Sequence, residues 1–240
     1  RPPRSTLFPY TTLFRSTWYW NRYPGARFDS ESYSYGYSFS KELLQEWEWS
    51  EHFAGQPETL RYCNYVADKF DLRRDIQFAS RVTSAIYQDE TRSWRITLES
   101  GAQHSCRFLI TAIGPLSTPT LPRIAGIDDF KGQSFHTARW PKEKVDFTGK
   151  RVAVIGTGAT GIQLIGEIAD KVGQLTVFQR RPNWSAPLNN SEISDAEMAD
   201  IRARYDEIFA ACALTPGSFV HGPDKRGFYE VSRERSEERR

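Results

Sequence analysis

Hydrophobic residues recur along this chain with two different periods, and the change of period predicts where helices and strands lie. Residues 57–71 have the three-to-four-residue period of an amphipathic helix, and Pro57 suits its first position. The apolar face of this segment consists of Leu60, Cys63, Val66, Ala67 and Phe70. The sequence therefore predicts a helix over residues 57–71.

Three runs after this helix have features that are typical of β-strands. Residues 76–88 are rich in β-branched side chains, and residues 94–98 alternate between apolar and polar. A turn at Gly101 leads into a third run, residues 106–113, which ends at Gly114. We therefore expect three strands, followed by an irregular linker marked by prolines and glycine.

A second regular unit is predicted to begin at Gly149. Residues 151–155 are almost wholly apolar, as is typical of a buried parallel strand. A glycine-rich turn joins this strand to a predicted helix over residues 160–172, and residues 175–178 form the next strand. This order is that of a βαβ unit, which indicates an α/β fold of the Rossmann type with a parallel sheet.

The remaining segments have weaker signals. The start of the chain after Thr17 is rich in aromatic residues, and Pro24-Gly25 predicts a turn in which glycine can take a positive φ. Residues 195–213 predict one further helix, with Ser194 as its N-cap.

Composition narrows the class of protein. The 240 residues include 32 basic and 30 acidic side chains, so the net charge of +2 does not indicate binding to nucleic acid or to a membrane. Cys63, Cys106 and Cys212 share no short spacing, which argues against a disulfide framework or a metal site and fits a reducing cytoplasm. No run approaches the roughly 18 apolar residues of a membrane span.

The glycine turn of the second unit matches the pattern G-x-G-x-x-G. The first glycine permits the tight turn, the second lets the backbone approach a pyrophosphate, and the third permits close packing of helix on strand. The N-terminus of the helix then faces the phosphates with free amides and a positive dipole. A purely structural glycine turn is the alternative. The predicted cofactor-binding residues here are Gly156, Thr157, Gly158, Ala159, Thr160, Gly161 and Gln163.

The end of the second strand of this unit indicates which dinucleotide binds. A carboxylate about 20 residues after the first glycine would bind the ribose 2′-hydroxyl of NAD. This chain instead has Gln179-Arg180-Arg181, and a guanidinium suits the 2′-phosphate of NADP(H). We expect Arg180 to bind this phosphate with Arg181 beside it; the alternative is that both are solvated surface residues.

The linker contains a longer pattern, F-x-G-x-x-x-H-x-x-x-W-P. Phe130, Gly132, His136, Trp140 and Pro141 occupy all of its fixed positions. In this the chain resembles type I Baeyer–Villiger monooxygenases, which are class B flavin-containing monooxygenases. The resemblance implies that His136 couples the two nucleotide domains, and a buried structural histidine is the alternative. A metal site is not indicated, because no second metal-ligating residue stands at a suitable spacing from His136.

A second pattern of the same family, G-G-x-W-x-x-x-x-[FY]-P-G-x-x-x-D, is matched from its tryptophan onwards. Trp18, Tyr23, Pro24, Gly25 and Asp29 take the fixed positions, whereas Arg15-Ser16 stands where the glycine pair is expected. The resemblance implies that the residues that contact FAD are Trp18, Asp29, Tyr35 and Val82, and that Asp29 belongs to the catalytic site, near the arginine that acts in catalysis. For Tyr35 and Val82 the alternative is ordinary packing, and for Asp29 it is a turn-stabilising carboxylate.

The resemblance implies a flavoprotein with two dinucleotide-binding domains, of which this chain would be an internal fragment. The FAD domain would be incomplete, because its own glycine fingerprint is not found, and the NADP domain would be partly present. The implied divisions are a non-native leader (1–16), the remaining FAD domain (17–120), the linker (121–148), the NADP domain (149–230) and a non-native tail (231–240). Genuine disordered or solvated termini are the alternative for both ends.

By the same resemblance, the implied activity is that of an NADPH- and FAD-dependent monooxygenase, and this chain, as a fragment of it, is expected to be inactive by itself. Such an enzyme inserts one oxygen atom from O2 beside a ketone carbonyl and forms an ester or lactone. The arginine that the family uses in catalysis is expected outside this chain and is assigned to no residue, Arg226 included. Oxygenation of amines or sulfides, and an NADP-binding module without catalysis, are the two alternatives.

Overall fold

The computed structural model describes residues 16–114, 116, 119–183 and 185–220 of the chain. The chain divides into two compact units: unit 1 comprises residues 1–23 and 59–144, and unit 2 comprises residues 24–58 and 145–240. The leader expected over residues 1–16 lies outside the described residues except for Ser16, and so do the tail and Arg226. Residues 24–58, which were expected in the first domain, group here with the second unit.

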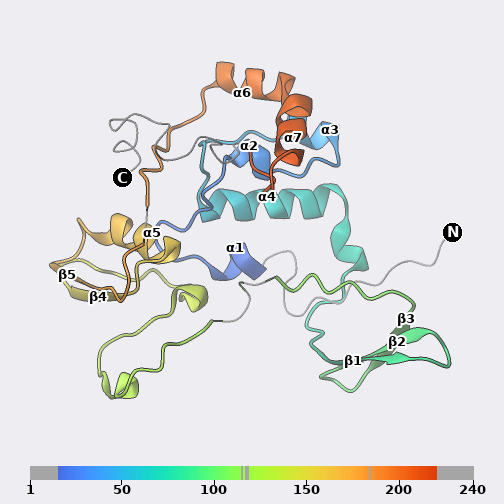
Figure 1. Ribbon diagram of the computed structural model, residues 1–240, viewed down its shortest axis with the longest axis horizontal. Coiled ribbons are helices and arrows are strands. Elements are labelled where there is room, and N and C mark those ends of the chain that lie inside the picture. Colours follow the sequence, from blue (N-terminus) through green and yellow to red (C-terminus); the bar gives the residue numbers. More distant parts are fainter. Residues whose placement is uncertain (1–15, 115, 117–118, 184, 221–240) are drawn as a thin grey trace, which may run out of the picture. The chain divides into compact units, whose positions relative to one another are not determined.

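Unit 1 contains an antiparallel sheet in the order β1-β2-β3 (Figure 1). Its strands are β1 (Val82–Gln88), β2 (Ser93–Leu98) and β3 (Gln103–Cys106). The alternation of β2 turns Ile96 and Leu98 inward, where they are 1% and 2% exposed. Two of the three predicted strands are therefore confirmed in place, although β1 begins six residues later than residue 76.

The third predicted strand, residues 106–113, is wrong. The strand β3 ends at Cys106, where the prediction placed its start. Residues 107–113 form no strand, and the side chains of Phe108 and Ile110 are 83% and 88% exposed. A run of apolar residues alone suggested a strand here, but a strand also needs a hydrogen-bonded neighbour, and the described residues supply none for this segment.

Unit 1 also contains α-helix α1 and most of α-helix α4. Helix α1 (Ser16–Trp20) is a single short turn that carries aromatic residues. Helix α4 (Gln56–Lys69) confirms the helix predicted over residues 57–71, and its Tyr62, Cys63, Val66 and Ala67 are buried. Its first turn belongs to the segment of unit 2 and the rest to unit 1.

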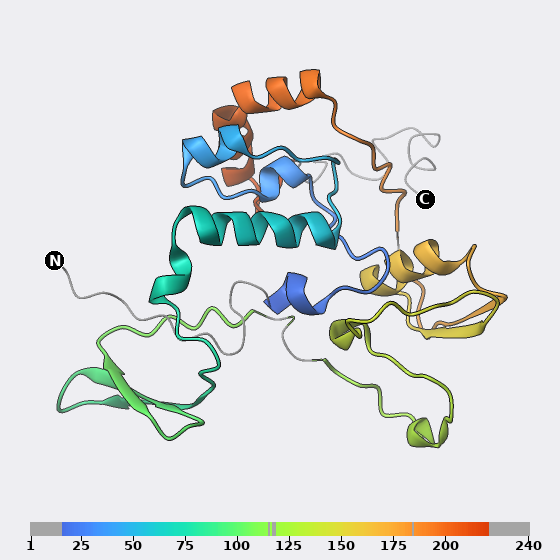
Figure 2. The same cartoon turned by 180° about the vertical axis from the view of Figure 1, so that it is seen from behind.

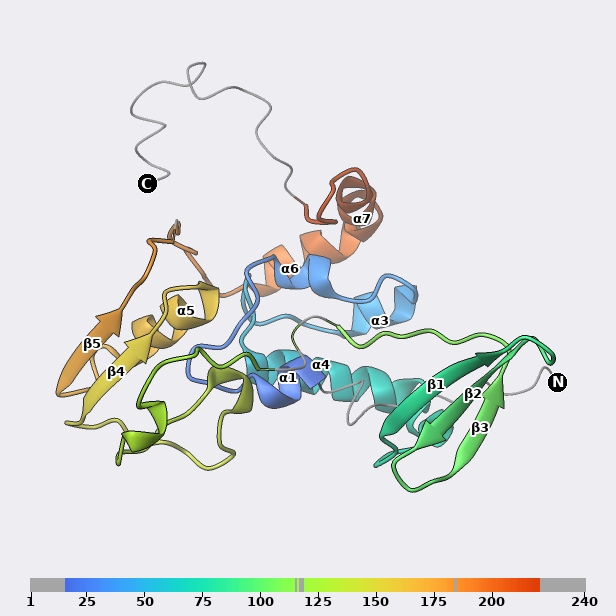
Figure 3. The same ribbon diagram turned by 60° about the horizontal axis from the view of Figure 1, so that its bottom comes forward.

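The βαβ part of unit 2 has the predicted order. Strands β4 (Arg151–Ile155) and β5 (Gln174–Phe178) pair in parallel, with Ile155 opposite Phe178 (Figure 3). Helix α5 (Ala159–Ile168) joins them and buries Leu164 and Ile168. It ends four residues before the predicted residue 172.

Unit 2 also contains four short helices: α2 (Ser32–Tyr35), α3 (Lys41–Glu46), α6 (Asp195–Ala203) and α7 (Tyr205–Ala213). In Figures 1 and 2 the pair α6 and α7 lies beside α2 and α3. Together these segments bury Leu43, Leu44, Trp49, Met198, Ile201, Tyr205, Ile208 and Cys212. No helix among the described residues is long and apolar enough to cross a membrane.

The prediction of one helix over residues 195–213 is wrong, because the chain breaks at Arg204 into two helices. Arg204 has φ −109° and ψ 10°, outside helical geometry. The buried positions keep a three-to-four-residue spacing across the break and no glycine or proline marks it, so the sequence pattern does not reveal it. The N-cap is confirmed: the Ser194 hydroxyl accepts from the Glu197 N–H at 3.3 Å.

Candidate functional site

The glycine turn between β4 and α5 is tight. Gly156 has φ +104°, in the range that favours glycine, and its N–H donates to the Phe178 carbonyl oxygen at 2.9 Å. A Cβ added at Gly161 would lie 2.5 Å from the Gly156 carbonyl oxygen. Any side chain at position 161 would therefore force the helix away from the turn, which is the role expected of the third glycine.

The same turn is open on its outer side. A Cβ added at Gly158, the N-cap of α5, would meet no other protein atom within 4 Å. The first turn of a helix carries N–H groups without intrahelical acceptors, and the helix dipole makes this end positive. A turn that combines open space with free amides fits a pyrophosphate group.

The polar residues that follow β5 lie at this same edge of the sheet. The Gln179 Nε2 donates to the Thr157 hydroxyl at 2.9 Å, so the end of β5 is joined to the glycine turn. Arg180 and Arg181 come next; both are exposed, and neither has an ion pair or hydrogen bond within the described part of the chain. The predicted arginines therefore directly follow a residue that contacts the turn, and they are unengaged, whereas the contact made by Gln179 was not foreseen.

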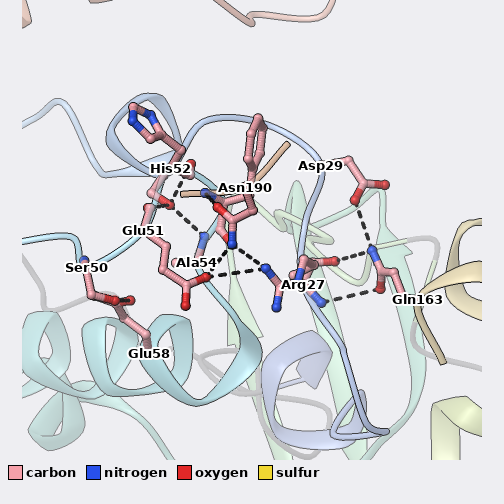
Figure 4. A network of polar contacts seen from close by, with 11 residues as sticks. Arg27, Asp29, Ser50, Glu51, His52, Ala54, Glu58, Gln163 and Asn190 are labelled. Atoms are coloured by element: carbon pink, nitrogen blue, oxygen red, sulfur yellow. Dashed lines mark hydrogen bonds and ion pairs between the residues drawn. The ribbon is translucent and has the colours of Figure 1, made fainter. Parts of the chain in front are cut away.

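The predicted Asp29 lies beside helix α5 (Figure 4). Gln163, in the second turn of α5, donates from Nε2 to Asp29 Oδ1 and to the Arg27 carbonyl oxygen, both at 3.0 Å. Its Oε1 accepts from the Arg27 N–H at 3.4 Å. The predicted turn at Gly25 is confirmed with φ +78°, and a Cβ there would lie 2.7 Å from the Gln163 carbonyl oxygen. Backbone and side chain of Gln163 thus both contact residues 25–29.

A chain of polar contacts continues from Arg27 into the helical segments (Figure 4). The Arg27 guanidinium pairs with the Glu51 carboxylate at 3.3 Å and donates to the Phe53 carbonyl oxygen at 3.2 Å. The Asn190 amide donates to Glu51 at 2.5 Å and accepts from the Phe53 N–H at 2.9 Å. Each of these side chains is therefore bound to a neighbour in the network. Because Asn190 is 163 residues from Arg27 in the sequence, no local pattern could have revealed the network.

A second cluster in unit 2 surrounds Tyr33. The His52 Nε2 lies 3.1 Å from the Glu197 carboxylate, and its ring packs edge-on against Tyr33. Burial raises the pKa of the Tyr33 phenol, and the carboxylates of Glu31 and Glu197 raise it further. This phenol therefore stays neutral and contributes packing between the segments.

The other predicted flavin residues are distributed between the two units. In unit 1, Trp18 is 9% exposed and Val82 begins β1. In unit 2, Tyr35 is partly exposed and stacks on Phe28, with ring centroids 3.9 Å apart. Stacking of this kind fixes the position of the Tyr35 ring.

The residues of the linker pattern lie in unit 1. The His136 Nδ1 accepts from the Ala138 N–H at 3.1 Å and caps the short 3-10 turn that Thr137 begins. Trp140 is 9% exposed, and its ring packs against the Phe135 ring with 5.4 Å between the ring centroids. The Arg139 guanidinium lies 4.9 Å from the Trp20 ring centroid, a cation–π contact between the two patterns that was not predicted.

The cysteines of the chain are free thiols. Burial raises the pKa of the Cys63 thiol to about 11, so this thiol is protonated and unreactive at neutral pH. Among the described residues, no group of histidine, cysteine or acidic side chains is arranged to hold a metal ion.

Comparisons with known proteins agree with these features. The family model for flavin-binding monooxygenase-like proteins matches residues 43–196. The chain is 51% identical, over 90% of its length, to 2-oxo-Δ3-4,5,5-trimethylcyclopentenylacetyl-CoA monooxygenase of Pseudomonas putida. It is 50% identical, over 80% of its length, to the methyl acetate-forming acetone monooxygenase of Gordonia sp. strain TY-5. It spans 41% and 36% of these relatives.

A solved structure gives the same result for the fold. The crystal structure of OTEMO in complex with FAD and NADP is 48% identical, with a TM-score of 0.89 over 97% of this chain and 44% of that one. This confirms the predicted α/β fold, which is that of a flavoprotein with two dinucleotide-binding domains.

Proposed function

Because the chain belongs to the flavin-binding monooxygenase-like family, we propose that the protein is an NADPH- and FAD-dependent monooxygenase that converts ketones to esters or lactones. The observation that carries this proposal is the complete linker pattern from Phe130 to Pro141 in a chain that also has the NADP-type glycine turn. The 50% identity to an acetone monooxygenase that forms methyl acetate supports the ketone branch over oxygenation of amines or sulfides.

The proposed NADP site is the glycine turn with the residues after β5. The open space at Gly158 and the close approach of Gly161 to Gly156 fit a bound pyrophosphate. The proposed contacts are Gly156, Thr157, Gly158, Ala159, Thr160, Gly161, Arg180 and Arg181, with Gln163 following in the same helix. When bound, NADPH supplies the hydride and FAD supplies the chemistry that activates O2, whereas the protein residues bind and orient both.

The proposed flavin contacts are Trp18, Asp29, Tyr35 and Val82. Burial of Trp18 and stacking of Tyr35 give these rings fixed positions, and the Asp29 carboxylate is oriented by a hydrogen bond. His136 is proposed to couple the domains and not to react, because its Nδ1 is engaged as a cap of the linker turn.

We also retain the proposed organisation of the whole protein. The FAD domain would include residues 17–120, the linker residues 121–148 and the NADP domain residues 149–230. A cytoplasmic location is supported by three free cysteines, since such thiols persist in a reducing compartment. The partners are small molecules, a ketone and O2.

The reaction is tested by product analysis. The whole protein that contains this chain is incubated with FAD, NADPH, O2 and cyclohexanone, and the products are identified by mass spectrometry. We expect a lactone that contains one atom of 18O when the reaction is run under 18O2. Oxygenation of an amine or sulfide with no product from any ketone would contradict the ketone assignment.

The choice of NADP is tested at Arg180. Removing a guanidinium that binds a phosphate costs about 1.5–3 kcal/mol, so Arg180→Ala should weaken NADPH binding roughly 10- to 100-fold. Binding of NADH should not change, because NADH has no 2′-phosphate. Affinities are measured by fluorescence titration, with Arg151→Ala at the opposite end of β4 as the control. An unchanged ratio of NADPH to NADH affinity would remove the assignment.

A further inference from the structure

The Asp29 carboxylate is held by one donor. Among the described residues, the Gln163 amide is the only group that donates a hydrogen bond to it, and the Asp29 side chain is otherwise exposed. An exposed aspartate samples several rotamers unless a partner selects one. The direction of this carboxylate therefore depends on a residue of helix α5, 134 positions further along the chain.

The Gln163 amide is itself fixed in orientation. Its Oε1 accepts from the Arg27 N–H while its Nε2 donates to the Arg27 carbonyl oxygen. Turning the amide over would place oxygen against oxygen and nitrogen against nitrogen, so both bonds would be lost. The Arg27 backbone thus determines that an N–H group, and not the carbonyl oxygen, faces Asp29 (Figure 4).

Arg27 cannot move easily to relax this arrangement. Its guanidinium is bound to the Glu51 carboxylate and to the Phe53 carbonyl oxygen, and Glu51 is bound in turn by Asn190. On its other side, the Gly25 backbone lies so close to the Gln163 carbonyl oxygen that no Cβ would fit. Residues 25–29 are therefore held against α5 from both sides.

We propose that Gln163 is a positioning residue, which orients the Asp29 carboxylate and ties it to the dinucleotide helix. The inference rests on the proposed function, in which Asp29 faces the flavin and α5 carries the NADP turn. Gln163 makes the two motifs move together, because it belongs to the helix of one and binds the aspartate of the other. This role is exerted through Asp29 and is separate from the contact with NADP that is proposed for Gln163.

The contact is tested by NMR without any cofactor. In the protein labelled with 15N, the side-chain amide protons of Gln163 should resonate downfield, since one of them is bound to a carboxylate. Asp29→Ala should move that resonance upfield, whereas Asp170→Ala in the turn that follows the same helix should leave it in place. A Gln163 amide resonance that does not respond to Asp29→Ala would overturn the proposal.

Substitutions that change the charges at positions 163 and 29 test the coupling between Gln163 and Asp29. Gln163→Glu keeps the acceptor for the Arg27 N–H but sets a second carboxylate against Asp29, and we expect the unfolding equilibrium constant to rise about 10-fold. Asp29→Asn in that background should recover at least about 3-fold, because its amide can donate to the new carboxylate. The control is Gln174→Glu, which adds the same charge on β5. No recovery in the double variant would refute the coupling.

NADPH titration of the same variants separates this inference from the proposed function. If the unmodified protein binds NADPH, the effect of Gln163→Glu on affinity should also be reversed by Asp29→Asn. If Gln163→Glu weakens binding equally in both backgrounds, Gln163 acts directly on the dinucleotide and the positioning role is wrong. If the unmodified protein binds no NADPH, the proposed NADP site fails, and the NMR and unfolding results still decide the role of Gln163.

Discussion

Two parts of unit 2 are built in different ways. The helical part, residues 24–58 and 190–213, buries a continuous set of apolar side chains and connects its segments by the Arg27–Glu51–Asn190 network. The βαβ part, residues 149–181, covers its two strands with α5 but leaves Ile155 and Phe178 63% and 56% exposed. The helical part is thus held by its own packing, and the βαβ part is held mainly by the backbone of its turn and sheet.

The difference shows that the part with more buried packing and the part with the candidate NADP site are not the same. Every residue proposed to bind NADP lies in the βαβ part, where the glycine turn and the arginines after β5 are open. The described contacts between the two parts centre on Gln163, which meets Gly25, Arg27 and Asp29. A small contact area of this kind makes single substitutions informative.

The largest effect is expected at Gly25. Gly25→Ala would place a methyl group 2.7 Å from the Gln163 carbonyl oxygen, in a backbone conformation with φ +78° that side chains rarely adopt. Strain and steric overlap together should lower the free energy of unfolding by about 3 kcal/mol. The measurement is chemical denaturation of the purified protein followed by tryptophan fluorescence.

Gly149 provides a matched control for that substitution. It also has a positive φ, +68°, but a Cβ there would meet no atom within 4 Å. Gly149→Ala should therefore lower the free energy of unfolding only by the backbone strain, about 1 kcal/mol. Equal losses at the two glycines would mean that the close approach to α5 contributes nothing, and the contact between the two parts would lose its support.

A smaller effect is expected from pH in the helical part. Burial raises the pKa of the Tyr205 phenol to about 12, against 10 for a free phenol. The folded state therefore favours the neutral phenol, so its contribution is fully present below pH 10 and is lost as the pH rises from 10 to about 12. The loss should amount to about 2 kcal/mol in the free energy of unfolding.

The contribution of Tyr205 is isolated by comparison with Tyr205→Phe. Stability is measured by denaturation at intervals from pH 8 to pH 12, because other groups also titrate in this range. The decline above pH 10 should be shallower in the variant. Identical profiles for the two proteins would show that this phenol ionises as readily in the fold as in the unfolded chain.

The βαβ part could be predicted from its sequence, whereas the helical part could be predicted only in pieces. Strand β4, the glycine turn, α5 and β5 are consecutive, and their apolar periods and glycines act over short distances. The Ser194 cap and the turn at Gly25 are likewise local and are confirmed. Such signals need no knowledge of distant partners.

The features that sequence reasoning missed leave no local signal in the sequence. The apolar run within residues 106–113 predicts a strand, but strand formation depends on a neighbour that the pattern does not specify. The break at Arg204 leaves the hydrophobic spacing intact. The Gln163–Asp29 bond joins two motifs that were each recognised, yet nothing in either motif states that they touch.

The smallest effect is expected at the ion pair between Lys41 and Asp206. These side chains come from α3 and α7 and lie 3.1 Å apart, but they are 79% and 84% exposed, against 25% and 37% for Arg27 and Glu51. Water and salt screen such a pair, so Lys41→Met, Asp206→Ala and the double variant should each change the free energy of unfolding by less than about 0.5 kcal/mol. A double-mutant cycle by chemical denaturation measures the coupling. A coupling above about 1 kcal/mol would show that surface charges, and not the buried side chains and the Arg27–Glu51–Asn190 network, hold the helical part together.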